Sequence, residues 1–553
     1  MVWQGASIFS SKFKSVKHIF VILSVFCSAW AVAQTTIDIR DLGAIGDGNF
    51  VNTSIIQQAI DSVSALGGGT VLITNGTYKS STVVFKSKVT LRITTGDTLL
   101  AVSNNSDYPE IPYNARSWSD TYTQRSLIFA EDADSIRITG GGIISGNGLN
   151  VAYLQVSKNF RPFGVRMHHC TNVTIDSIQL ISAPQWMVHL MDCEGVYMHH
   201  INIYNHGLGS NDGINVDACR NVLIEDCIVD SNDDPIVVKS HSEKVCSNVL
   251  VRRCEVATFE RGIKVGNESL GPFINIRFED ILIRKSGFFI SLPAQTAIYL
   301  SIADGGSADS ISFERITVTT AYDTPIFVRL CNRGLKYDSQ APPPPVNYLR
   351  NVWLKDITAI AASNIPSSIT GIPGFPVENI YLDNITIQAP GNGPVGNTTQ
   401  PELETLRPEN DIWGNTLPAY GLYVRHVEGL VLDSFCVNLD AADPRPMLYF
   451  EDTLNVTGGE CMRLTSAVKE APINAALKVY PNPAATTLQV VGLPANELLH
   501  ITVTDQLGRI FMQHWFTHPS NQAQINIAEL PAGIYYLQVQ GAQTLHGARF
   551  VRE

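Results

Sequence analysis

The sequence contains few charged residues. Asp, Glu, Lys and Arg make up only 16% of its 553 residues, against roughly 25% in an average soluble domain. This shortage excludes a disordered chain and a long coiled coil. The net charge of −12 offers no basic surface to a nucleic acid, so we expect no nucleic-acid partner. The 41 glycines and 28 prolines favour strands joined by turns.

Cysteine pairs with metal-site spacing are also absent. The ten cysteines include no C-x-x-C pair, which argues against a zinc knuckle or a thioredoxin-like redox site. Several cysteines occupy positions where buried strands are predicted below, and packing is their expected role. We expect neither a bound metal nor a cofactor.

Long apolar runs are missing except near the N-terminus. There, three lysines precede an apolar run from Ile19 to Trp30, and Ala31-Val32-Ala33 forms a small-x-small cleavage site. This pattern predicts a signal peptide over residues 1–33, with an N-terminal membrane anchor as the alternative. We therefore expect a soluble, exported protein, and we expect it to be a monomer.

A sequence repeat of nine residues, which we call the phrase, recurs between Asn172 and Val437. Its second, fourth, seventh and ninth positions are apolar in almost every copy. The copies are NVTIDSIQL from Asn172, GVYMHHINI from Gly195, NVLIEDCIV from Asn221, NVLVRRCEV from Asn248, NIRFEDILI from Asn275, SISFERITV from Ser310, NVWLKDITA from Asn351, NIYLDNITI from Asn379 and GLVLDSFCV from Gly429.

The spacing inside the phrase predicts two short strands around a corner. Positions two and four alternate as in a strand, and so do positions seven and nine, while the step of three between them needs a bend. The first copies are 23, 26, 27 and 27 residues apart, which is too short for a strand, a packed helix and a second strand. The repeat therefore predicts a parallel β-helix, with leucine-rich repeats as the alternative.

Other segments lie outside the repeat. TSIIQQAIDSVSALGGG from Thr53 predicts an amphipathic helix capped by Thr53, placed to cover the open end of the solenoid. From Leu477 onward, alternating strands with turn residues predict a small β-sandwich. We thus divide the chain into a solenoid over 34–465, a linker over 466–476 and a sandwich over 477–553.

Three acids are spaced by about one coil. Asp212 lies in Asn211-Asp212-Gly213, and Asp233 and Asp234 follow 21 residues later. Stacked coils would bring the three carboxyls to one face outside the core, where crowding keeps one of them protonated. A protonated acid beside an ionised base suits glycoside hydrolysis, and an inverting enzyme separates the two by about 6.5–9.5 Å. Taken singly, each acid is an ordinary turn residue.

Cations follow the acids at similar spacing. Alternation predicts Lys239, and one of Arg261 or Lys264 on the next coil, close to the aspartates. In an acidic protein, clustered cations favour an anionic substrate such as a uronic acid polymer. The alternative is ion pairing of these cations with the aspartates themselves.

At these residues the chain resembles glycoside hydrolase family 28, the polygalacturonases and rhamnogalacturonan hydrolases, over roughly residues 36–460. Asn211-Asp212-Gly213 stands for the family's N-T-D element and Asp233-Asp234 for its paired D-D. The resemblance implies a right-handed parallel β-helix and inverting hydrolysis of a pectic polysaccharide. It also implies that Asp233 is the general acid, that Asp212 and Asp234 hold the attacking water, and that Asn211 binds substrate.

Two family motifs differ in this sequence. Glu260-Arg261-Gly262 stands where G-H-G is expected, so the usual histidine is missing. The substrate-binding R-I-K is echoed by Arg261 and Lys264, and Arg329 is a further candidate. These departures make a rhamnogalacturonan or exo-acting galacturonide hydrolase as plausible as an endo-polygalacturonase.

The tail resembles the C-terminal sorting domain of proteins exported by type IX secretion. The motifs are YPNP (Tyr480–Pro483), DQLGR (Asp505–Arg509) and LPAGIYYLQV (Leu530–Val539). The resemblance implies the type IX secretion machinery as a partner and a secreted or cell-surface location. An ordinary carbohydrate-binding sandwich is the alternative.

Two other functions fit the same fold. A polysaccharide lyase would use a Lys or Arg base and hold Ca²⁺ among the acids, and a non-catalytic adhesin would only bind glycans. Two inserted loops, from Gly334 to Tyr348 and from Ala389 to Tyr420, are expected to decide substrate specificity.

Overall fold

The protein is described by a computed structural model. It describes residues 35–112, 123–287, 293–335, 344–409, 411–460, 477–493, 498–505, 510–517, 522–528, 530–540 and 545–553. The predicted signal peptide, residues 1–33, and the predicted linker, residues 466–476, lie outside these ranges. Within them, no helix is both long and apolar enough to cross a membrane.

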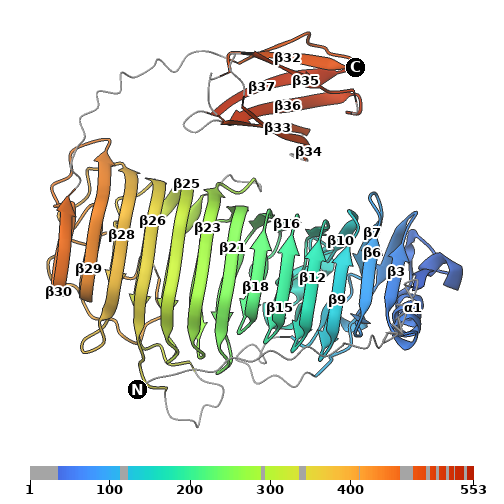
Figure 1. Ribbon diagram of the computed structural model, residues 1–553, viewed down its shortest axis with the longest axis horizontal. Helices are drawn as coiled ribbons and strands as arrows, with labels where there is room; N and C mark the ends of the chain where they lie inside the picture. The colour runs from blue at the N-terminus through green and yellow to red at the C-terminus, as the bar shows by residue number, and fades with distance from the viewer. Residues whose placement is uncertain are drawn as a thin grey trace, which may run out of the picture.

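The larger part of the chain is a parallel β-helix whose coils stack side by side (Figure 1). One face, which we call the site sheet, runs through β5 (Val83–Val84), β8 (Ser126–Glu131), β11 (Phe163–His168), β14 (Val188–Met191), β17 (Ile214–Asp217), β20 (Ile236–Ser240), β22 (Arg261–Ser269), β24 (Ala294–Ile302), the end of β25 (Ala308–Leu330), β27 (Ser367–Thr370), β29 (Leu422–Leu439) and β30 (Leu448–Glu460). All of these pairings are parallel.

Two further faces carry the repeated phrase. The second face runs through β1 (Thr35–Asp38), β3 (Gly69–Ile73), β6 (Val89–Ile93), β9 (Asp134–Thr139), β12 (Thr171–Asp176), β15 (Glu194–His199), β18 (Arg220–Glu225), β21 (Cys246–Ala257), β23 (Phe273–Arg284), β25, β26 (Leu349–Ala361), β28 (Val377–Ala389) and β29. The third runs through β2 (Asp47–Val51), β4 (Thr77–Ser80), β7 (Thr98–Ala101), β10 (Ile143–Ser145), β13 (Gln179–Ile181), β16 (Asn202–Asn205) and β19 (Ile228–Ser231). From β21 onward, one long strand serves both faces.

The corner inside each phrase comes from a residue in the left-handed region. Position six has a positive φ in every copy, for example 54° at Asp226 and 55° at Asp280. Position one is also left-handed, which favours Asn and Gly there because other side chains are strained in this conformation. Neighbouring asparagines then bond along the axis: Asn275 donates to Asn248 (2.9 Å), which donates to Asn221 (3.0 Å).

The apolar positions of the phrase fill one continuous core. Positions two, four and seven point inward on both sides of the corner, as predicted, and their side chains are buried. Cysteines share this core: Cys170, Cys193, Cys219 and Cys246 are free and buried on four successive coils. Packing is therefore their structural role.

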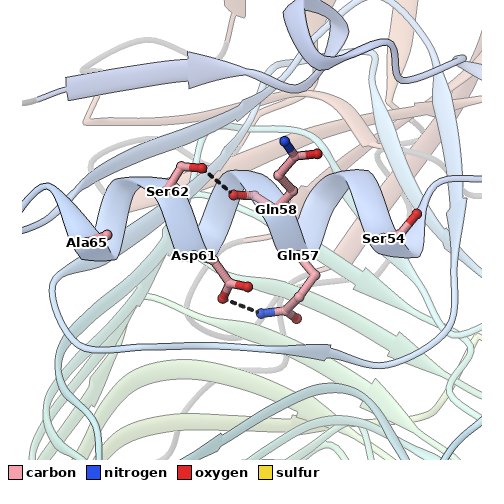
Figure 2. Close-up of a pocket in the computed structure, with 6 residues that line it drawn as sticks. All are labelled: Ser54, Gln57, Gln58, Asp61, Ser62 and Ala65. Carbon is pink, nitrogen blue, oxygen red and sulfur yellow. Dashed lines mark hydrogen bonds between the residues drawn. The ribbon is translucent and has the colours of Figure 1, made fainter.

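The N-terminal helix α1 (Thr53–Ala65) lies at the end of the solenoid (Figure 1) and buries Ile56, Ala59, Ile60 and Val63 against its core. Its outward side is polar, where Gln57 Nε2 donates to Asp61 Oδ1 (3.0 Å; Figure 2).

The predicted capping role of Thr53 is wrong. Asn52 is the N-cap, and the Thr53 hydroxyl instead accepts from the Ser81 amide (2.8 Å), because the first turn packs against that strand connection.

The C-terminal part has two antiparallel sheets. One contains β31 (Lys478–Tyr480), β32 (Thr487–Val491) and β35 (Gln522–Asn526), and the other contains β34 (Ile510–Thr517), β33 (Leu498–Asp505), β36 (Gly533–Gln540) and β37 (Leu545–Arg552). Side chains from both sheets, such as Leu488 and Leu537, share one buried cluster. The predicted fold class, a right-handed parallel β-helix with an N-terminal helix followed by a small β-sandwich, is confirmed.

Candidate active site

The three predicted acids lie on neighbouring coils of the site sheet. Asp212 precedes β17, and Asp233 and Asp234 lie in the turn between β19 and β20. The Gly213 amide donates to the Asp234 carbonyl (3.0 Å), and Ile214 pairs with Ile236, so Asp212 lies beside the aspartate pair. Because the pair stands in a turn rather than in a strand, both of its side chains are free of strict alternation.

Two lysines approach these acids from the same sheet. Lys239 Nζ lies 3.3 Å from Asp212 Oδ2, and Lys264 Nζ lies 2.6 Å from Asp234 Oδ2. All four side chains are 3–5% exposed. Burial opposes the charge on Lys239, but the Asp212 carboxylate raises the pKa of this lysine above its ordinary value. Both lysines therefore form ion pairs with the aspartates, as the alternative interpretation of these cations expected.

Asp233 differs from its two neighbours. It is half-buried, and within the described ranges no Lys, Arg or His side chain forms an ion pair with it. Its Oδ1 accepts a hydrogen bond from the Asp234 amide (3.0 Å). Burial raises the pKa of Asp233, and the negative charge of Asp234 raises it further.

The pKa of Asp212 is raised by the same two causes. Burial raises its pKa well above the usual range, Lys239 opposes this rise, and the charges of Asp233 and Asp234 add to it. The Asp212 carbonyl accepts from Asn205 Nδ2 (2.8 Å), which fixes the backbone at this corner.

Asn211 has its side-chain amide engaged within the protein. Its Nδ2 donates to the Ala183 carbonyl (2.7 Å), and its Oδ1 accepts the Leu208 amide (2.7 Å). The structure thus places Asn211 where it holds the loop that leads into Asp212. Its predicted contact with substrate stays a prediction.

The predicted arginines lie farther along the sheet. Arg261 forms ion pairs with Glu260 and with Glu409 and lies over the Tyr299 ring at 5.7 Å. Burial raises the pKa of Glu260 to about 7, against the opposing charge of Arg261, and Asp233 and Asp234 add to the rise.

Arg329 lies two coils beyond Arg261. It donates to Thr370 Oγ1 (3.1 Å) and to carbonyls of the long insertion. The structure does not bring it to the acids.

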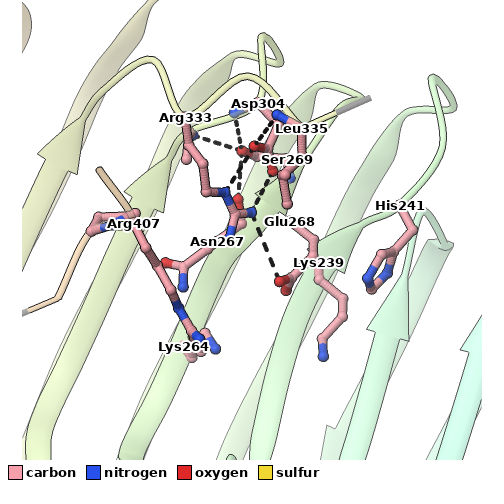
Figure 3. Close-up of polar contacts among 12 residues, drawn as sticks. Lys239, His241, Lys264, Asn267, Glu268, Ser269, Asp304, Arg333, Leu335 and Arg407 are labelled. Carbon is pink, nitrogen blue, oxygen red and sulfur yellow. Dashed lines mark hydrogen bonds and ion pairs between the residues drawn. The ribbon is translucent and has the colours of Figure 1, made fainter. Parts of the chain in front are cut away.

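A second polar cluster flanks the lysines (Figure 3). Arg333 donates two hydrogen bonds to Asp304 (3.0 and 2.6 Å) and approaches Glu268 to 3.8 Å. Burial acts against the charge of Glu268, but Lys239 and Lys264 dominate and lower its pKa below the ordinary range. No spacing pattern in the sequence predicted this cluster, because Glu268 lies at the end of β22, whereas Asp304 follows β24 and Arg333 follows β25.

Beside Lys239, one buried carboxylate joins two imidazoles. Asp217 Oδ2 lies 3.0 Å from His189 Nε2 and 2.7 Å from His241 Nδ1. Trp186 packs against these residues and carries Lys239 Nζ 4.1 Å above its ring. Strand alternation could have predicted that His241 lies near the site, because it follows Lys239 by two residues and so lies on the same face of the strand.

The arrangement can hold an acid and a base at once. Among the described Lys, Arg and His side chains, two lysines pair with Asp212 and Asp234 and none pairs with Asp233, although the charges of Lys264 and Arg261 act against the rise of its pKa. An uncompensated, desolvated carboxyl keeps its proton to higher pH. The site therefore offers a proton donor beside two carboxyls that are tied to ammonium groups.

Comparisons with known proteins agree with this geometry. Residues 478–552 match the family described as "Secretion system C-terminal sorting domain". This domain marks the protein for type IX export, so the protein is secreted or attached to the cell surface. A probable polygalacturonase of Vitis vinifera is 27% identical over 369 residues, covering 63% of this chain and 73% of the relative. An exo-poly-alpha-D-galacturonosidase of Dickeya chrysanthemi is 39% identical over 120 residues, which are 20% of this chain and 19% of the relative.

A solved structure shares the fold. The family 28 exopolygalacturonase of Yersinia enterocolitica matches with a TM-score of 0.59 and 18% identity, covering 77% of this chain and 78% of that one. Residues 65–402, more than half of the chain, match the family described as "Glycosyl hydrolases family 28". The protein is therefore a glycosidase and belongs to glycosyl hydrolases family 28.

Proposed function

We propose that the protein hydrolyses a pectic polysaccharide that contains galacturonic acid, with inversion at the anomeric carbon. Asp233 donates its proton to the glycosidic oxygen as the bond to the leaving sugar breaks. A water molecule held by Asp212 and Asp234 attacks the anomeric carbon from the opposite face and gives up a proton to one of these two carboxylates.

One observation carries this assignment: of the three acids, only Asp233 forms no ion pair with the described Lys, Arg and His side chains. Asp212 and Asp234 each form an ion pair with a lysine within 3.3 Å, whereas Asp233 forms none with the described Lys, Arg and His side chains, and burial and the charge of Asp234 raise its pKa. The proposed division of roles follows from these contacts: the acid without an ion pair donates the proton, and the two carboxyls paired with lysines hold the water.

The basic residues support a uronic acid substrate. Lys239 and Lys264 lie beside the acids, and Arg261 and Arg333 lie on the adjoining coils and turns. A uronate carboxylate that enters this site would meet several desolvated donors. The names of the similar proteins, polygalacturonase and exo-poly-alpha-D-galacturonosidase, support the same substrate class.

The test is incubation with homogalacturonan and with rhamnogalacturonan, followed by product sizing and NMR of the newly formed anomer. We expect hydrolysis of at least one polymer with inverted configuration. An unsaturated product that absorbs in the ultraviolet would instead show a lyase, and binding without cleavage would show an adhesin.

Variants locate the reaction. Asp233→Asn should lower kcat by about 10²–10⁴-fold, the usual contribution of a general acid. Asp280→Asn is the matched control, because Asp280 is an exposed aspartate that pairs with Arg315 on another face. Equal activity of the two variants would show that Asp233 is not the acid.

A further inference from the structure

The long insertion between β28 and β29 crosses the outward face of the site sheet. We call residues 397–409 the strap. At its base, Arg425 of β29 donates to the Gln400 carbonyl (2.9 Å) and pairs with the Glu402 carboxylate. His426 Nε2 lies 3.0 Å from the other oxygen of Glu402.

From this base the strap runs backward over earlier coils. Arg329 of β25 donates to the carbonyls of Glu402 (2.9 Å) and Leu403 (3.1 Å). The Tyr299 hydroxyl of β24 donates to the Pro408 carbonyl, and Arg261 of β22 pairs with Glu409. Arg329, Tyr299 and Arg261 thus lie on three successive coils and supply the donors, and the strap supplies the acceptors.

These contacts bury side chains that would otherwise face the solvent. Tyr299 is 0% exposed and Arg329 is 1% exposed, although both project from the outside of the solenoid. Trp413 of the same insertion adds a ring 4.9 Å from the Arg329 guanidinium. The strap is therefore a fixed part of the surface and not a loose loop.

The strap ends close to the acids. Tyr299, which holds Pro408, is the register partner of Lys264, and Lys264 pairs with Asp234. Arg407, the strap's only basic residue, is drawn with Lys264 in Figure 3; it pairs with Glu409 (2.7 Å), and its side chain is 58% exposed.

The opposite flank of the site is covered as well. Arg166 of β11 and His189 of β14 project outward but are 1% and 0% exposed, and Arg166 donates to the Thr123 carbonyl. Only about three coil steps separate β14 from β22, or about 14 Å at about 4.8 Å per step. A polymer laid along the sheet would meet protein on both sides of the acids.

We propose that the strap restricts the enzyme to chain ends. The terminal galacturonate would lie between the aspartates and the strap, where Arg407 binds its carboxylate. The strap would leave no room on the sheet for further sugar residues on that side of the terminal galacturonate. This inference rests on the proposed hydrolysis of galacturonan.

End-blocked substrates test the inference with the full-length wild type. One oligogalacturonide carries a reduced reducing end, and the other carries an unsaturated non-reducing end. We expect one of the two to resist hydrolysis completely, and we expect homogalacturonan to yield a single small product from the first time point with slow loss of viscosity.

The outcomes separate the two proposals. If no galacturonan is cleaved, the proposed function fails. If both blocked substrates are cleaved and mixed oligomers appear early, the function stands and the role of the strap is refuted.

A strap variant supplies the second measurement. Glu402→Ala removes the carboxylate that fastens the base of the strap to Arg425 and His426, so mixed oligomers should join the single product. Glu404→Gln is the control, because among the described residues Glu404 is held only through its main-chain carbonyl, which accepts from the Asn332 amide (2.7 Å). A folded Glu402→Ala variant that keeps the wild-type product pattern would contradict the inference.

Discussion

The ion pair between Lys264 and Asp234 should dominate the stability of the site. The two charged atoms lie 2.6 Å apart and are 4–5% exposed. At an effective dielectric constant of about 20, their attraction is about 6 kcal/mol, most of which offsets the loss of hydration. Lys264→Met leaves Asp234 buried and unpaired, so we expect the free energy of unfolding to fall by about 3–5 kcal/mol.

An exposed pair on the same solenoid provides the control. Lys355 and Asp383 lie 3.2 Å apart with 50% and 43% exposure, so Lys355→Met should cost only about 0–1 kcal/mol. Urea unfolding followed by circular dichroism measures both changes. The double variant Lys264→Met/Asp234→Asn should regain most of the stability, because no unpaired charge remains. Equal losses for the two lysine variants, or no recovery in the double variant, would refute the reasoning.

Three further changes follow from the same structure. Burial lowers the pKa of His189 to about 4, so as pH falls below about 6.5 this imidazole gains a proton in the unfolded chain but not in the folded chain. The free energy of unfolding should therefore fall by about 3 kcal/mol between pH 7 and pH 4. Urea titrations of the His189→Gln variant should lack this loss. The raised pKa of Asp233 keeps the acid protonated at low pH, so kcat/KM should decline as pH rises through that pKa; a rate that increases over the same range would contradict its role. Asn275→Ala places alanine at a φ of 57° and breaks the bond to Asn248, which should cost about 1–2 kcal/mol in thermal unfolding, whereas Asn275→Gly should cost less.

The repeat made the fold predictable from sequence. Apolar residues at positions two, four, seven and nine require two strands and a corner, and the left-handed residue at position six provides that corner. The one-coil interval from Asp212 to the Asp233-Asp234 pair also predicted their juxtaposition, because stacking converts a sequence interval into a neighbour.

Contacts made by the insertions could not be predicted in this way. Glu409 reaches Arg261 across 148 residues, and no periodicity relates a loop to the coil that it covers. The cap of α1 was mispredicted for a similar reason: Thr53 bonds to Ser81, a tertiary contact that local helix rules do not include.

The asparagine column along the second face also bears on how the solenoid comes apart. The strands of each coil bond to the coil before and the coil after it, while the strap adds contacts from the β28–β29 connection back to Arg261 and Tyr299. Helix α1 shields the first coil, while β30 is the last described strand of the stack. Fraying should accordingly start at β30, and loss of β29 would free the base of the strap from Arg425 and His426, so a protease that trims this end should release the strap before it reaches the coils that carry the acids.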